Sequence, residues 1–103
     1  MKRVFELTPD ELFDEVTERL GDAAGETAPN WPRDKVAALR LHDGIAHKNG
    51  WRSGHWNDGE AYVAYFMAGG SDWTHWTHLA RAEPLAEALT RSALTALRAA
   101  NAQ

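Results

Sequence analysis

An aromatic run between two turn signals is the feature that most constrains the fold of this 103-residue chain. Residues 61–68 are Ala-Tyr-Val-Ala-Tyr-Phe-Met-Ala, a composition typical of a β-strand. Asp58-Gly59 precedes the run and Gly69-Gly70 follows it, and both pairs favour tight turns. The sequence therefore predicts a three-stranded antiparallel meander with strands at 51–56, 61–68 and 73–79.

Helix signals flank the predicted meander on both sides. Thr8-Pro9-Asp10-Glu11 combines a capping box with a proline at the first helical position, and Gly21 supplies a stop. Residues 33–48 contain a possible strand at 36–41, but their Ala content and length favour one helix that ends at Asn49-Gly50. We expect helices at 9–20 and 33–48 separated by a 21–32 loop, and a long last helix from Pro84 onward.

Alternation along the predicted strands divides the large side chains between two faces of the sheet. One face is predicted to hold Trp51, Ser53, His55, Tyr62, Ala64, Phe66, Trp73, His75 and Leu79. The other is predicted to hold Arg52, Trp56, Val63, Tyr65, Met67, Trp76 and His78. Because both faces carry large apolar groups, we expect helices on both sides of the sheet, or helices on one side and a second subunit on the other.

Composition and charge exclude several classes of protein. Residues 1–30 carry three Lys or Arg against eight Asp or Glu, net −5, and the remainder carries eight against seven, net +1. Without a basic stripe, nonspecific nucleic-acid binding is not expected. No apolar run is long enough to span a membrane, and the N-terminus lacks the apolar stretch of a secretory signal. With no cysteine to form disulfides, these features favour a cytoplasmic protein.

The order of these segments resembles a known family. An acidic Leu12-Phe13-Asp14-Glu15-Val16 helix is followed by an Ala-rich helix, a Gly50-Trp51 junction, aromatic strands and a Pro84-Leu85-Ala86-Glu87 helix. This pattern resembles the small phage proteins of the phage alpha-beta-alpha sandwich type. The resemblance implies a single α+β domain over residues 1–103, packed as an alpha-beta-alpha sandwich, with a phage or prophage origin and an accessory role.

The motifs do not indicate catalysis or metal binding. His75 and His78 would face apart on a strand, His55 lies too far along the meander to share an ion with His75, and no His-Glu-x-x-His pattern is present. Ser53, Ser71, Asp58 and Asp72 lack the context of a nucleophile elbow or triad. We therefore expect no catalytic residues, no metal and no cofactor.

The expected functional surface is an aromatic patch that also carries cationic and titratable groups. Flat rings beside Arg and His suit a planar ligand such as a nucleotide base, or a protein partner. The patch comprises Arg52, Trp56, Tyr65, Trp76 and His78. The leading hypothesis is a noncatalytic phage or prophage accessory protein that binds a host protein or a small planar ligand, including in counter-defence. A self-associating structural or assembly protein, and a His-dependent metal protein or enzyme, are the alternatives.

Overall fold

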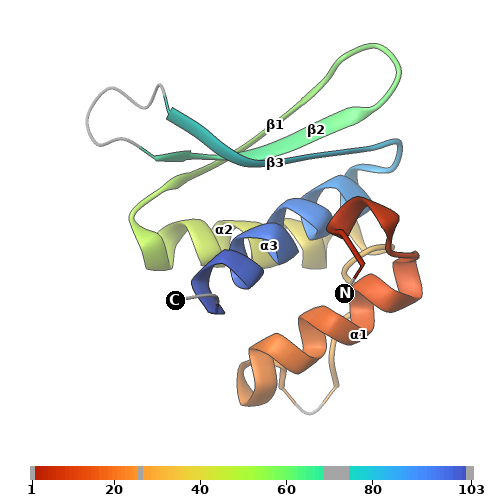
Figure 1. Cartoon of the computed structure of the whole chain (residues 1–103), viewed down its shortest axis with the longest axis vertical. Coiled ribbons are helices and arrows are strands. Elements are labelled where there is room, and N and C mark those ends of the chain that lie inside the picture. Colours follow the sequence, from red (N-terminus) through yellow and green to blue (C-terminus); the bar gives the residue numbers. More distant parts are fainter. Residues whose placement is uncertain (1, 26, 69–74, 102–103) are drawn as a thin grey trace.

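Over the residues that the structure describes, the protein is an α+β structure with three α-helices and a three-stranded antiparallel sheet (Figure 1). The computed structural model describes residues 2–25, 27–68 and 75–101. In chain order the elements are η1 (Val4–Glu6), α1 (Pro9–Leu20), η2 (Gly21–Ala24), α2 (Lys35–Asn49), β1 (Arg52–Asn57), β2 (Tyr62–Ala68), β3 (His75–Ala82) and α3 (Leu85–Asn101). This order broadly agrees with the prediction. The predicted turn at 69–72 and Trp73, predicted to share a face with Phe66, lie outside the described residues.

The helix boundaries follow from local capping chemistry. The capping box that begins α1 is present: the Glu11 backbone N–H donates to Thr8 Oγ1, and the Thr8 N–H donates to the Glu11 carboxylate. In α2 the Ala37 N–H donates to the Asp34 carboxylate, and the chain leaves the helix at Gly50 in the left-handed conformation. Residues 33–48 therefore form essentially one helix, as predicted.

The layers differ from the predicted sandwich. Both α2 and α3 lie on one face of the sheet, and α1 packs beyond them on the side away from the strands (Figure 1). The alpha-beta-alpha sandwich is therefore not confirmed. The physical reason is that the N-terminal segment is bonded to α3. Arg98 of α3 donates to both carboxylate oxygens of Glu15 in α1, and Arg91 of α3 donates to the carbonyls of Val4 and Leu7, which precede α1. These bonds hold the N-terminal segment on α3 and away from the sheet.

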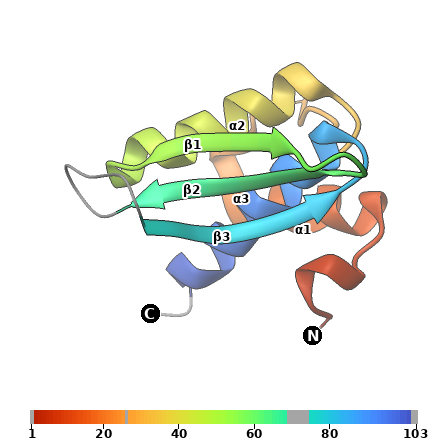
Figure 2. The same cartoon turned by 90° about the horizontal axis from the view of Figure 1, so that it is seen from above.

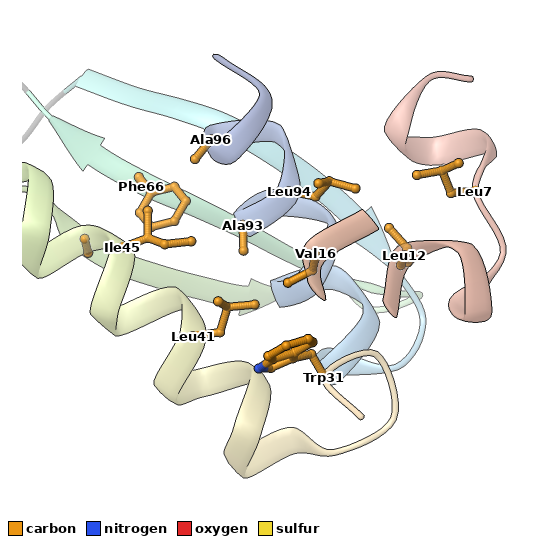
Figure 3. Close-up of a cluster of buried hydrophobic side chains, with 11 residues drawn as sticks. Leu7, Leu12, Val16, Trp31, Leu41, Ile45, Phe66, Ala93, Leu94 and Ala96 are labelled. Atoms are coloured by element: carbon orange, nitrogen blue, oxygen red, sulfur yellow. The ribbon is translucent and has the colours of Figure 1, made fainter. Parts of the chain in front are cut away.

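The main core extends from the sheet at Phe66, between α2 and α3, to α1 and the N-terminal segment (Figure 3). Phe66 is fully buried against α2 and α3. Trp31 at the end of the 21–32 loop is buried among the helices, where it anchors this loop. Trp51 is half-buried and its ring lies 5.4 Å from that of Phe66. A second cluster consists mostly of alanines: Ala38, Ala64, Ala86 and Ala88 pack with Leu89.

The hairpin between β1 and β2 has a longer turn than predicted. Asn57 pairs with Tyr62, so the register is displaced by two residues from the expected His55–Tyr62 pairing. The Asp58 carboxylate causes this change, because it accepts from the N–H groups of Glu60 and Ala61 and closes a wider loop. A displacement of two residues leaves every side chain on its predicted face.

A bulge in β3 does change the predicted faces. Phe66 pairs with Thr77 and Ala64 pairs with Ala80, so β3 contains one extra residue between these pairs. His78 lies at this point with a φ of 52°, a left-handed conformation that is uncommon for residues other than glycine. Its ring contacts Trp51 and Phe66 on the helix-covered face. The predicted placement of His78 on the other face is therefore wrong, as is the placement of Leu79 with Phe66.

Candidate binding surface on the open face of the sheet

One face of the sheet carries no helix in the described part of the chain (Figure 2). We call this the open face. Three of its large apolar side chains are about half exposed: Trp56 at 50%, Trp76 at 48% and Leu79 at 53%. The residues that the register and the contacts place there are Arg52, Gly54, Trp56, Val63, Tyr65, Met67, Trp76, Leu79 and Arg81.

An aromatic stack covers the centre of the open face. Tyr65 and Trp76 lie parallel, with ring centroids 4.4 Å apart and planes 9° apart. Tyr65 is only 9% exposed although no helix covers it. Gly54 makes this possible, because a Cβ at that position would lie 2.5 Å from Tyr65 Cε2. The missing side chain leaves space in which the Tyr65 ring lies against β1.

A shallow groove runs beside this stack. It has a volume of about 350 Å³ and is lined by Trp56, Val63, Trp76, Leu79, Ala80 and Arg81. Its charged end is organised by Arg81, whose guanidinium lies 2.8 Å from the Asp58 carboxylate and 3.3 Å from that of Glu60. The Arg81 guanidinium and the turn N–H groups hold the pKa of Asp58 well below its ordinary value. Arg52 lies at the other end of the sheet, paired with Met67.

The structure therefore brings together four of the five residues of the predicted patch. Arg52, Trp56, Tyr65 and Trp76 share the open face, and His78 is on the opposite face because of the bulge. Sequence reasoning missed Leu79 and Arg81 as members of this surface. Strict alternation could not place Leu79, since the extra residue in β3 reverses the phase of the strand.

A buried polar cluster on the covered face was also missed. His42 is fully buried, stacks on Phe66 at 3.8 Å and contacts two serines, with Nδ1 2.5 Å from Ser53 Oγ and Nε2 2.9 Å from Ser92 Oγ. Ser92 donates its hydroxyl proton to the His78 carbonyl, so Ser92 Oγ accepts from His42 Nε2–H. Nδ1 is then the acceptor for the Ser53 hydroxyl. His42 shares the apolar stripe of α2 with Ala38 and Ile45, a signal that could have identified it as buried.

The electrostatics of His42 are those of a neutral core residue. Burial, with a smaller contribution from nearby His55, lowers the pKa of His42 to about 3. An imidazole with this pKa is a weak general base near neutral pH, so it activates Ser53 poorly. The described residues also contain no group of three His, Asp or Glu side chains close enough to hold a metal ion.

No family model, curated protein or solved structure matches this chain. Among the described helices, none combines the length and apolar character required to cross a membrane.

Proposed function

We propose that this chain is a noncatalytic binding protein whose open face is a protein–protein interface. The observation that carries the proposal is the grouping of Trp56, Trp76 and Leu79, each about half exposed, on a sheet face without a helix in the described part of the chain. Large apolar patches with charged groups at their margins are typical of interaction surfaces. The neutral, enclosed state of His42 supports a noncatalytic role.

The shape of the open face favours a protein partner over a small planar ligand. Small-molecule sites enclose most of the ligand surface, whereas the groove beside Trp76 is shallow. The aromatic ring suited to stacking with a base, Tyr65, is already covered by Trp76. A flat partner surface would contact Trp56, Trp76 and Leu79 together.

The partner that we propose for the open face is a second copy of this chain. Arg81, Asp58 and Glu60 form a charged group at the margin of the face, beside the turn between β1 and β2. A two-fold axis makes the same patch contact itself on both subunits, so Trp56, Trp76 and Leu79 of one copy would face those of the other. The second copy would also cover the apolar centre, giving the sheet helices on one side and a subunit on the other.

The size of the open face predicts a weak dimer. Three strands about 4.8 Å apart, with the seven residues of β2 rising about 3.3 Å each, give a face of roughly 14 by 23 Å. Two such faces bury less than the roughly 1,200 Å² typical of stable complexes. We expect association that depends on concentration.

Sedimentation velocity tests this proposal over protein concentrations from about 10 μM to about 1 mM. The wild-type protein is expected to shift from monomer toward dimer, and the double variant Trp56→Ser, Trp76→Ser to remain monomeric with an unchanged circular dichroism spectrum. Val36→Thr is the matched control, because Val36 is equally exposed on α2, away from the open face. A wild-type protein that stays monomeric throughout would refute self-association through this face.

The resemblance to small phage proteins extends the proposal to a biological setting. A noncatalytic phage or prophage protein acts by binding, and its target would be a host protein, including a component of host defence. This part of the proposal rests on the resemblance. It places a host protein on the open face, in place of the second copy of this chain proposed above. A monomeric protein whose open-face variants lose a phage-associated activity would favour the host partner.

A further inference from the structure

A second surface, on the helical side of the molecule, has the features of a ligand site. A pocket of about 430 Å³ lies between α2, the end of α1 and the loop that follows it. This volume is within the range of small-molecule sites. Its lining residues are Leu20, Ala23, Ala24, Pro29, Trp31, Ala37, Arg40, Leu41, Gly44, Ile45, Lys48 and Leu97. The floor is continuous with the main core, because Trp31, Leu41 and Ile45 belong to both.

The two charged residues of the pocket are both cations. Arg40 and Lys48 are exposed on α2, and neither has a hydrogen bond or ion pair within the described part of the protein. Most other arginines differ: Arg19, Arg81, Arg91 and Arg98, for example, are all held by carboxylates. In a chain of net charge −4, two cations beside one apolar pocket favour an anionic ligand.

Gly44 sets the position of the anionic group. Arg40, Gly44 and Lys48 are four residues apart and therefore follow one face of α2. The two cations are about 12 Å apart along the helix axis, with Gly44 about 6 Å from each, within reach of both long side chains. A Cβ on Gly44 would meet nothing within 4 Å, so the space above this residue is open.

We propose that this pocket binds a single-chain amphiphile with an anionic head group, of the fatty-acid class. The alkyl chain lies on Trp31, Leu41, Ile45 and Leu97, and the head group lies above Gly44 between Arg40 and Lys48. This site is separate from the open face and does not depend on the function proposed for that face.

Isothermal titration calorimetry with dodecanoate, below its micelle concentration, tests the proposal. We expect saturable binding with one site per chain, and displacement of the Gly44 and Ala37 amide resonances in NMR spectra. Dodecanol, which has the same chain without the charge, is expected to bind at least tenfold more weakly. Dodecyl phosphate in a parallel titration distinguishes a carboxylate from a phosphate head group. Absence of saturable binding by both anions would overturn the proposal.

Three variants separate specific binding from loss of structure. Gly44→Leu fills open space in a helix, so it is expected to raise the melting temperature while reducing dodecanoate affinity at least tenfold. Arg40→Glu with Lys48→Glu is expected to abolish the preference for dodecanoate over dodecanol. Lys35→Glu is the matched control, because Lys35 is exposed on the same helix and does not line the pocket. The proposal would also be overturned if Lys35→Glu reduced the affinity for dodecanoate as much as the double variant Arg40→Glu, Lys48→Glu does.

Discussion

The two faces of the sheet bury their residues in different ways. On the covered face, small side chains such as Ala64 and Ser53 let α2 and α3 approach the strands, and Phe66 fills the remaining space. On the open face, larger rings partly shield one another, as Trp76 shields Tyr65. Aromatic content therefore does not identify the core of this protein. The small residues that permit close packing of the helices identify it better.

The largest expected difference between the faces is in stability. Phe66→Ala should lower the free energy of unfolding by about 3–5 kcal/mol, because it leaves a cavity between the sheet and both helices. Chemical denaturation measures this change, and Trp76→Ala on the open face is the comparison. If Trp76→Ala lowered the free energy of unfolding as much as Phe66→Ala does, the open face would be as strongly packed as the core.

The covered face should also confer a pH dependence on stability. The pKa of His42 is about 3 in the folded protein, against an ordinary value of 6.5 for the unfolded chain. Below pH 6.5 the unfolded chain therefore gains a proton that the folded chain excludes. Stability is thus fully present above pH 6.5 and falls by about 2 kcal/mol between pH 7 and pH 5 from this group. His42→Gln should remove the contribution of this group, and His47→Gln, an exposed position on α2, should retain it. A pH profile unchanged by His42→Gln would contradict this account.

Glycine substitutions should have opposite effects at two positions. Gly54→Ala should cost about 1–2 kcal/mol, because the new Cβ displaces the Tyr65 ring from β1. Gly44→Ala in the interior of α2 should instead gain up to about 1 kcal/mol, since nothing lies near its Cβ. Thermal unfolding of both variants, with near-ultraviolet circular dichroism for the Tyr65–Trp76 stack, measures these effects. If Gly54→Ala left the melting temperature unchanged, the Tyr65–Trp76 stack would have moved aside without strain.

The smallest expected effect is at Trp56. Because half of this side chain is already exposed, Trp56→Ser should change the stability of the monomer by about 0.5 kcal/mol or less. Denaturation at low protein concentration, where association is absent, gives this value. A loss above about 2 kcal/mol would place Trp56 in the folding core and would remove it as an interface residue.

Local signals predicted most of the secondary structure. The Thr8 capping box and the Gly50 cap each determine backbone geometry within a few residues, and both occur where they were expected. Asp58-Gly59 lies in the connection between β1 and β2 as expected, but in a longer turn than predicted. The side of the sheet that each helix covers was not predictable, since it depends on long-range bonds such as Arg98–Glu15. The functional hypotheses, the family resemblance and the cytoplasmic location remain predictions.

The candidate surface was predictable up to the bulge. Alternation correctly grouped Arg52, Trp56, Tyr65 and Trp76, because β1, β2 and the first residues of β3 are regular. It failed for His78 and Leu79, since no residue in Trp76-Thr77-His78-Leu79 signals an extra position. The pocket beside Gly44 was also missed, because its walls come from three separate segments of the chain.

The inserted position at His78 has a consequence for how this chain is aligned with any homologue. The bulge is tied to α3 through the Ser92 hydroxyl, which donates to the His78 carbonyl. An alignment with a homologue that lacks the bulge needs a one-residue gap within β3. Without that gap, residues Leu79 to Ala82 would be matched with homologue residues that lie on the opposite face of the sheet. A deletion of His78 should accordingly be more harmful than any substitution there, because it shifts the phase of every residue that follows in the strand.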